Sequence, residues 1–451
     1  MTQTRYLLPL LFLFSVTSLF GQKLDVTGEL NLQGFISNED ELPFWMYANT
    51  RGRIAEDSDV AGWGSLTAKY ELTETAGFEA GGGILYSNGL KDEVSIDEAY
   101  LKFYNDWLEV VGGRKQKEEL YRGLSATNES FAWSLNARPM PGIQAKTART
   151  IFFNEANTFG FEASWNEYFM GKDRYVKNAR AHHKSLFLVY EKELWHIKAG
   201  IQHFAQWAGD SPRRGPQPEG FSDYVRVFFG RGGGSEANPA DQVNVLGNHL
   251  GTYELYITRE FKDFDLKFIY NHFFEDGSGS RFANFPDGRY GLFLDYKEDN
   301  RLVNGLLYEF YYTRNQSRNS SSPHKNDNYF DNRVTYNSGW TYQGRIIGVP
   351  FFDHDAEKFR ITGNKFVAHH LGVSGELGEP AAGHPYKLLL SYIHKDGTLT
   401  KDYTPHRKIF TGMLSLGVWR NFIDIDLNFA AEMRNVSGPL YGLGIQASKR
   451  F

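Results

Sequence analysis

The chain has 451 residues, no cysteine and a formal net charge of −5. The lack of cysteine excludes disulfide bonds and thiolate metal sites, and the negative charge gives no reason to expect a nucleic-acid partner. Aromatic residues make up 16% of the chain and the mean hydropathy is −0.47. This is far too polar for a bundle of membrane helices, but it suits a membrane β-barrel, in which only every second strand residue faces lipid.

The first 21 residues have the features of a secretory signal peptide. Arg5 precedes a short apolar run at 6–14, and small residues follow it. The run is too short to span about 30 Å of hydrocarbon comfortably, which makes a transmembrane anchor the weaker alternative. We expect cleavage between Gly21 and Gln22 and export of the mature chain to the outer membrane.

Beyond this segment, apolar and polar residues alternate with a period of two. Residues 66–72 read Leu-Thr-Ala-Lys-Tyr-Glu-Leu, and residues 423–429 read Ile-Asp-Ile-Asp-Leu-Asn-Phe. Such a strand has one apolar and one polar face, and many of these segments are long enough to cross a bilayer at a tilt. We therefore predict an all-β fold, a transmembrane antiparallel β-barrel that fills residues 44–451. Residues 22–43 are expected to be a periplasmic or first-strand segment, since 23–36 looks strand-like but does not fit the alternation of connections.

The pattern predicts about 18 strands. They are expected at 44–54, 62–72, 77–89, 94–104, 107–115, 140–153, 158–165, 184–193, 195–205, 249–260, 264–275, 289–297, 302–313, 366–376, 385–396, 407–418, 422–434 and 439–451.

Short and long connections alternate along the chain, as they do in barrels with short periplasmic turns and long external loops. Tight turns are expected at 74–75, 105–106, 192–193, 262–263 and 420–421, and long loops at 116–139, 166–183, 206–248, 276–288 and 314–365. The loops at 206–248 and 314–365 are large enough to fold inward, so we expect extracellular loops to plug the lumen.

The last segment is amphipathic and ends at Phe451. Tyr441, Leu443 and Ile445 alternate with glycine and polar residues. A final strand of this kind resembles the signal by which the barrel-assembly machinery recognises outer-membrane barrels, although it would also suit the closing strand of a soluble β-protein. We expect the assembly machinery and outer-membrane lipid among the partners.

No catalytic motif is present, and we expect neither an enzyme nor a cofactor. The adjacent pairs His182-His183 and His369-His370 point to opposite faces of a strand and cannot easily share a metal, so no metal site is predicted. Residues 231–235 resemble a phosphate loop only loosely. The pair Asp97-Glu98 is more readily explained as lumen lining than as part of a hydrolase.

Two loop regions mix aromatic, amide and arginine side chains, at 134–142 and at 326–352. Aromatic rings stack on the apolar faces of sugars, while amides and arginine bind hydroxyl and carboxylate groups. The alternative is a plug held by its own hydrogen bonds, and both roles are compatible with the sequence. The residues we expect to bind polysaccharide are Asn136, Arg138, Asp327, Tyr329, Trp340, Tyr342 and Arg345.

Three stretches of the chain are distinctive: Leu-Pro-Phe-Trp-Met-Tyr-Ala-Asn-Thr-Arg-Gly-Arg at 42–53, Asn-Ala-Arg-Pro-Met-Pro at 136–141, and 327–344. In these stretches the chain resembles the capsule assembly protein family Wzi, in the short form found in Bacteroides-type bacteria. The resemblance implies an 18-stranded outer-membrane barrel occluded by loops, with a lectin-like role and no enzymatic activity. Longer members carry a periplasmic helical bundle at the N-terminus, and this chain has at most a short stretch there.

These observations predict an outer-membrane protein that binds and retains or organises capsular or extracellular polysaccharide. A diffusion porin with a polar lumen is the alternative, and conductance would distinguish the two. An outer-membrane hydrolase would need a nucleophile beside a base, and the sequence does not assemble one.

Overall fold

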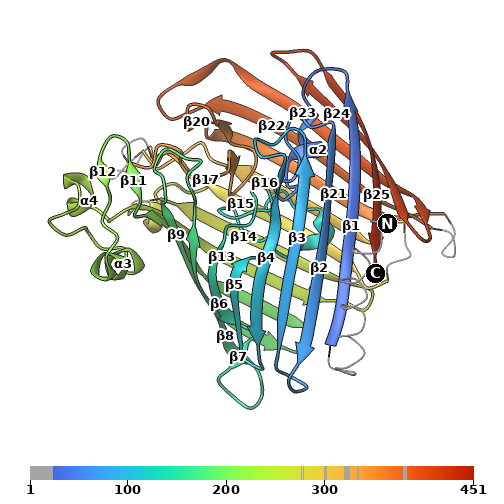
Figure 1. Ribbon diagram of the computed structural model, residues 1–451, viewed down its shortest axis with the longest axis horizontal. Coiled ribbons are helices and arrows are strands. Elements are labelled where there is room, and N and C mark those ends of the chain that lie inside the picture. Colours follow the sequence, from blue (N-terminus) through green and yellow to red (C-terminus); the bar gives the residue numbers. More distant parts are fainter. Residues whose placement is uncertain are drawn as a thin grey trace, which may run out of the picture.

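One antiparallel sheet closes on itself to form the body of the molecule (Figure 1). The computed structural model describes residues 24–275, 277, 279–298, 302–318, 326–332, 335–378 and 383–451, so the expected signal peptide lies outside the described residues. Each strand pairs with its neighbours along the chain, and β1 pairs with β2 on one side and with β25 on the other. These two pairings close the ring.

The sheet has 19 named strands, of which β6 and β7 are consecutive pieces of one barrel strand that both pair with β8, so the barrel has 18 strands. The barrel strands are β1 (Leu24–Ser37), β2 (Val60–Glu71), β3 (Gly77–Ser87), β4 (Val94–Tyr104), β5 (Leu108–Arg114), β6 (Gly142–Thr147), β7 (Ile151–Phe152), β8 (Phe159–Phe169), β9 (Arg180–Lys192), β10 (Trp195–Trp207), β13 (Asn248–Glu260), β14 (Phe264–Phe274), β15 (Gly288–Tyr296), β16 (Gly305–Tyr312), β21 (Lys365–Leu377), β22 (His384–Gly397), β23 (Asp402–Arg420), β24 (Asp424–Arg434) and β25 (Leu440–Arg450).

The remaining elements are short and lie in the connections. They are α2 (Phe44–Tyr47), η2 (Tyr121–Gly123), β11 (Asp210–Ser211), β12 (Gly215–Pro216), α3 (Phe221–Phe228), α4 (Pro239–Val243), η3 (Gly279–Arg281), β17 (Thr341–Tyr342), β18 (Arg345–Ile346), β19 (Asp353–Asp355) and β20 (Arg360–Gly363). Within the described part of the chain, no helix is both long and apolar enough to cross a membrane.

The predicted barrel and its strand number are confirmed, but one predicted strand is wrong. Residues 44–54 are not a strand, because they form α2 and an irregular stretch in which Asn49 and Arg51 have positive φ. The first barrel strand is instead β1, which covers the segment that did not fit the predicted alternation. The number of barrel strands is still 18, because β1 takes the place of the strand predicted at 44–54.

The two faces of the wall follow the sequence alternation. On β1, Leu30, Leu32 and Ile36 are exposed on the outer face, while Asn31 and Gln33 are buried on the inner face. Because every second residue of a membrane barrel faces lipid, this alternation places the apolar side outward. The expected pattern on the last strand is also present, since Tyr441, Leu443 and Ile445 are exposed.

The long connection between β10 and β13 lies outside the barrel, where α3 and α4 project from the wall (Figure 1). Tyr224 of α3 accepts a hydrogen bond from Trp165 Nε1 at 2.6 Å, and Lys184 contacts the end of the same helix. Lys184 shares a strand face with the exposed Leu186 and Leu188, which is the lipid side. The helical part of the 206–248 loop therefore lies outside the lumen, while Ala208 near its start accepts a hydrogen bond from the Tyr336 hydroxyl of the 314–365 loop.

Candidate functional site

In the described part of the chain, three loops share a buried hydrophobic core with the inward side chains of the wall, at the end of the barrel that carries the long connections. We call them the first (38–59), second (115–141) and third (313–364) plug loops, and together the plug. Their aromatic side chains meet inward residues of strands on several sides of the ring: Trp45 lies 4.9 Å from His370 of β21, Phe131 lies 4.9 Å from Phe273 of β14, and Trp340 lies 5.7 Å from Phe204 of β10 between ring centroids. The plug and the wall therefore share one hydrophobic core.

Main-chain hydrogen bonds join the plug loops to one another. The N–H of Ser134 in the second loop donates to Ile347 O of the third loop at 2.9 Å, and Val349 donates back to Phe131 O at 2.9 Å. Arg51 of the first loop donates its N–H to Leu135 O at 2.8 Å. Since buried main-chain groups need such partners, the three loops depend on one another.

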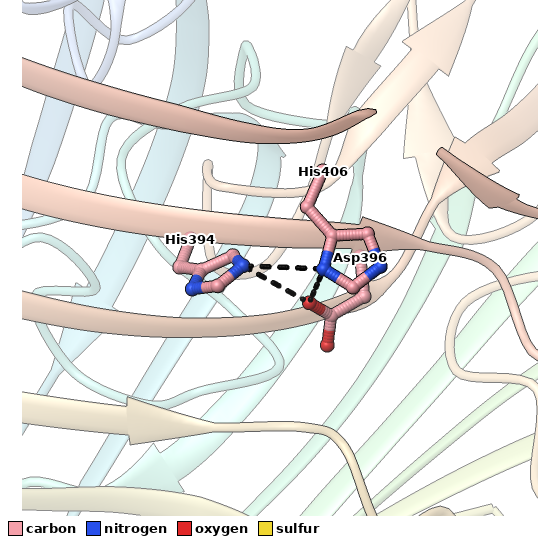
Figure 2. A group of neighbouring side chains, drawn as sticks. All are labelled: His394, Asp396 and His406. Carbon is pink, nitrogen blue, oxygen red and sulfur yellow. Dashed lines mark hydrogen bonds and ion pairs between the residues drawn. The ribbon is translucent and has the colours of Figure 1, made fainter. Parts of the chain in front are cut away.

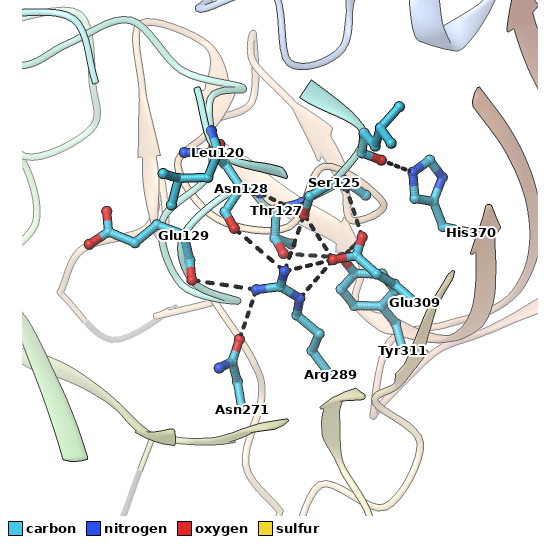
Figure 3. A network of polar contacts seen from close by, with 12 residues as sticks. Leu120, Ser125, Thr127, Asn128, Glu129, Asn271, Arg289, Glu309, Tyr311 and His370 are labelled. Atoms are coloured by element: carbon cyan, nitrogen blue, oxygen red, sulfur yellow. Dashed lines mark hydrogen bonds and ion pairs between the residues drawn. The ribbon is translucent and has the colours of Figure 1, made fainter. Parts of the chain in front are cut away.

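A buried ion pair ties the second plug loop to the wall (Figure 3). Arg289 of β15 and Glu309 of β16 have fully buried side chains, and Arg289 Nη2 lies 2.7 Å from Glu309 Oε1. Glu309 also accepts hydrogen bonds from Ser125 Oγ at 2.8 Å and from the Ala126 N–H at 2.9 Å. The hydroxyl of Tyr311 donates to it at 2.8 Å. Both carboxylate oxygens are thus satisfied away from water, as a buried charge requires.

The same guanidinium reaches further into the second loop (Figure 3). Arg289 donates to the carbonyl oxygens of Asn128 and Glu129, each at 3.4 Å, and to Asn271 Oδ1 of β14 at 3.2 Å. On β21, His370 Nε2 donates to Leu124 O at 2.7 Å. Strands β15, β16 and β21 therefore hold this loop through buried polar contacts, and β14 supports Arg289 through Asn271.

Above the plug, two adjoining hollows of about 710 Å³ and 790 Å³ form what we call the mouth cleft. The residues that line both hollows are Glu41, Glu56, Gly344, Arg345 and His354. The first hollow extends to the upper ends of β23 and β24, and the second extends to the connection between β3 and β4. The cleft thus crosses the outer surface of the plug from one part of the rim to another.

Aromatic and cationic side chains pair along the first hollow. The Arg345 guanidinium lies 5.0 Å from the ring centroid of Tyr47, and that of Arg407 lies 3.9 Å from the ring of Tyr403. Phe44 stands beside Tyr47 with ring centroids 5.7 Å apart. Rings and guanidinium groups in this arrangement offer stacking surfaces next to strong donors.

Acidic residues balance the cations of this hollow. Arg434 Nη1 lies 2.6 Å from Glu41 Oε1, and its Nε contacts Glu432. Asp353 contacts Lys395, accepts a hydrogen bond from the Tyr403 hydroxyl at 2.7 Å and lies 3.6 Å from Arg407. The cleft therefore presents donors and acceptors of both charges, which suits a polyhydroxylated ligand.

His354 stands where the two hollows meet. Burial lowers the pKa of its imidazole to about 4, so the ring is neutral at pH 7. The backbone of Gly344 interacts with one side of the ring. A neutral imidazole has a second nitrogen, which can accept a hydrogen bond from a ligand hydroxyl.

Three of the predicted binding residues line the mouth cleft. Arg345 borders both hollows, Asn136 borders the first and Arg138 borders the second. Asn136 and Arg138 are themselves largely buried and held in place: Asn136 Nδ2 donates to Ile346 O at 3.0 Å, and Arg138 Nη1 donates to Ser95 Oγ at 2.8 Å. Arg345 is the most accessible of the three and donates to Ile54 O at 2.5 Å.

Trp340 and Tyr342 lie inside the plug instead. Trp340 has no exposed surface, and its Nε1 donates to Ala132 O at 2.7 Å. The preceding Gly339 has a positive φ of 67°, and a Cβ there would lie 1.9 Å from Phe330 O, so this turn requires glycine. Tyr342 is buried, and its hydroxyl accepts a hydrogen bond from Arg114 at 3.1 Å. We assign both rings to holding the third loop.

Asp327 and Tyr329 are also buried away from the cleft. Asp327 Oδ2 accepts a hydrogen bond from Ser317 Oγ at 2.7 Å. The Tyr329 hydroxyl donates to Asp287 Oδ2 at 2.6 Å, and burial raises the pKa of Asp287 to about 6. Because the Asp327 carboxylate and the Tyr329 hydroxyl are bonded to neighbouring loop residues, we assign both residues to holding these loops together.

The hairpin formed by β22 and β23 also contributes to the mouth cleft, although none of the predicted binding residues lies on it. The predicted strand at 407–418 is part of β23, which spans 19 residues and extends above the wall. About 9–11 residues suffice to cross a bilayer, so its upper part, with Tyr403 and Arg407, stands clear of the membrane. The length and the run Tyr-Thr-Pro-His-Arg at 403–407 are the signal that could have identified it.

Comparison with known proteins places this architecture in one family. The family model described as capsule assembly protein Wzi matches residues 32–423. No curated protein sequence matches the chain. Among solved structures, Wzi of Escherichia coli, described as an outer membrane protein involved in group 1 capsule assembly and a carbohydrate-binding β-barrel, is 12% identical with a TM-score of 0.58, covering 97% of this chain and 87% of its own.

OccK5 (OpdH) of Pseudomonas aeruginosa is 10% identical with a TM-score of 0.50, covering 95% of this chain and 98% of its own. Both likenesses show the fold, while the family match covers most of the chain. The match assigns the chain to capsule assembly proteins rather than to an enzyme family. The chain therefore belongs to the capsule assembly protein Wzi family and is an outer-membrane β-barrel.

Proposed function

We propose that this protein binds capsular or extracellular polysaccharide in the mouth cleft and retains or organises it at the cell surface. The observation that carries the proposal is a long cleft, rich in aromatic and charged side chains, on the outer surface of a plug that fills the barrel. A diffusion porin needs an open lumen, and the plug packs against the wall inside this one, which argues against the porin alternative. Family membership and the description of the E. coli structure as carbohydrate-binding support the same ligand class.

Arg345 and Arg407 are the residues most suited to contact the polymer. Arginine has five N–H donors in a planar fork that matches a carboxylate, such as that of a uronic acid. In the described part of the chain, Arg345 uses one of them, toward Ile54 O. Arg407 is exposed at the rim above Tyr403, where a sugar ring could lie against both side chains. Affinity would come from several such contacts along the polymer.

The test is the variant carrying Arg345→Gln and Arg407→Gln. A hydrogen bond to a charged group contributes about 1.5–3 kcal/mol, so loss of these contacts should lower affinity for an acidic polysaccharide by at least about tenfold. Surface-bound and shed polysaccharide should be compared in cells, with the amount of barrel in the outer membrane measured in parallel. Arg360→Gln is the matched control, since Arg360 is exposed in the third loop but does not line the cleft. Equal retention in the double variant and the control would refute the assignment.

We also propose that the chain is the short form found in Bacteroides-type bacteria, which is supported by the three stretches that carry the family resemblance. An acidic capsular polysaccharide of such a bacterium is therefore the first ligand to test.

We propose that residues 1–21 are a signal peptide and that the barrel-assembly machinery recognises the strand ending at Phe451. The support is an amphipathic β25 whose terminal Phe451 exchanges main-chain hydrogen bonds with Gly28 of β1 at 2.7 Å and 3.0 Å, at the closing seam. Deleting Phe451 should lower the amount of folded barrel at least severalfold while leaving the N-terminus cut before Gln22. Heat-dependent gel mobility and N-terminal sequencing would measure the two effects, and normal folding without Phe451 would contradict the recognition role.

A further inference from the structure

Three potential metal ligands meet on the hairpin of β22 and β23 (Figure 2). His394 and Asp396 lie two residues apart on β22, and His406 lies on β23. The distances are 3.4 Å from His394 Nε2 to His406 Nδ1, 3.5 Å from His394 Nε2 to Asp396 Oδ1, and 3.4 Å from His406 Nδ1 to Asp396 Oδ1. The three atoms thus form a nearly equilateral triangle.

Strand periodicity places His394 on the outer face with the exposed Tyr392, while Ile393 between them is buried on the inner face. Asp396 lies where the pairing with β23 shifts register between Lys395 and Gly397, and its carboxylate lies beside His394. His394 pairs with Lys408 across the hairpin, which puts His406 on the same face and diagonally adjacent. The cluster therefore lies on the outer side of the wall, separate from the mouth cleft.

The spacing of the three atoms fits a tetrahedral metal ion. Zn²⁺ binds imidazole nitrogen and carboxylate oxygen at about 2.0–2.2 Å, and bonds of that length give edges of about 3.3–3.6 Å between ligands in a tetrahedron. All three measured distances, 3.4, 3.4 and 3.5 Å, fall in this range. An ion could sit over the triangle with small side-chain adjustments.

Asp396 is also held from a second side. Arg314 of the third plug loop donates from Nε to Asp396 Oδ2 at 2.5 Å and from Nη2 to Oδ1 at 2.9 Å. A carboxylate has about four acceptor positions, so Oδ1 can bond the guanidinium and still bind an ion. Such outer contacts orient metal ligands, although a nearby cation also weakens the binding of another cation.

We infer that His394, Asp396 and His406 form a binding site for a borderline divalent metal ion, of which Zn²⁺ is the representative. The two imidazoles and the carboxylate supply three ligands, and the fourth position faces solvent because His406 is exposed at the rim of the barrel. A bound ion would link β22 to β23 near the end of the hairpin and so stabilise it. Metal binding at this site does not depend on bound polysaccharide.

Calorimetric titration of the folded full-length mature protein with Zn²⁺, in detergent and without a polyhistidine tag, tests the proposal. We expect one ion per chain and at least about a tenfold loss of affinity in His406→Asn. His369→Asn is the matched control, because His369 is also an exposed outward histidine, on the neighbouring β21. Among the described residues, its imidazole hydrogen-bonds the Tyr308 hydroxyl and contacts no carboxylate. Undiminished affinity in His406→Asn, or an equal loss in the control, would overturn the site.

A second measurement separates a built site from general adhesion of metal to surface histidines. Co²⁺ bound in place of Zn²⁺ should give the intense visible absorption of a four-coordinate ion, and His406→Asn should abolish it. Heat-dependent gel mobility checks that each variant is folded. A six-coordinate Co²⁺ spectrum in the unaltered protein would overturn the tetrahedral geometry and with it the proposed site.

Discussion

Replacing Glu309 with alanine is expected to lower the free energy of unfolding by about 3–5 kcal/mol. The change leaves Arg289 as a charge without a counterion at a position with no exposed side-chain surface. It also removes the acceptor that Ser125 Oγ and the Ala126 N–H share, so the second plug loop loses its attachment to β16. Denaturant unfolding of the barrel in lipid vesicles, followed by tryptophan fluorescence, measures the loss.

The double variant Arg289→Met, Glu309→Leu separates the cost of an unpaired charge from the loss of the contact. Replacing both partners by apolar side chains of similar size is often neutral, so this variant should recover most of the stability lost in Glu309→Ala. Lys358→Ala is the surface control, because the Lys358–Asp355 pair is solvent-exposed on the lysine side and should leave unfolding unchanged. A Glu309→Ala protein as stable as this control would show that the ion pair does not hold the plug.

Much of the barrel could be predicted because one physical rule acts along the whole wall. Lipid on one side and a polar interior on the other impose a period of two, and that period is visible in the sequence. The error at 44–54 arose where the rule stops applying. Adjacent Trp45 and Met46 are both buried, because a loop inside the lumen is surrounded on all sides. The aromatic residues at 44–47 are typical of strands, although here they form a short helix.

The candidate site could be predicted only in part, because composition does not say which side of a loop faces outward. The cluster around 326–352 mixes aromatic, amide and arginine residues, and the structure divides it. Arg345 borders the mouth cleft, whereas Tyr329 and Trp340 have no exposed surface. The same residue types serve both roles, since hydrogen bonds that can bind a sugar can equally hold a plug.

Groups that meet across a hairpin were beyond a reading of local motifs. Adjacent histidine pairs can be recognised in the sequence, but their side chains point to opposite faces of a strand. His394 and His406 lie on different strands of one hairpin, and their proximity depends on the register in which β22 and β23 pair. Tyr403 and Arg407 were also not predicted. They line the cleft because β23 is long enough to extend above the wall.

Replacing Trp340 with alanine is expected to lower the free energy of unfolding by about 3–5 kcal/mol and to make the barrel leaky to ions. The indole is fully buried between the second plug loop and the wall, with its ring 5.7 Å from Phe204 and 6.3 Å from Trp133. Its removal leaves a cavity and frees Ala132 O, so the loops that occlude the lumen lose their common contact. Denaturant unfolding and single-channel conductance in planar bilayers measure the two effects.

The matched control is Trp419→Ala, which removes an indole that is more than half exposed at the other end of β23. It deletes the same chemical group without touching the plug, so conductance should stay at the level of the unaltered protein. A steady open channel in the unaltered protein would instead support the porin alternative, because a plug that already conducts cannot be what seals the lumen. If Trp340→Ala is as stable and as silent as the control, the shared aromatic core does not hold the plug in place, and the surface that bears the mouth cleft must be held by the polar contacts alone.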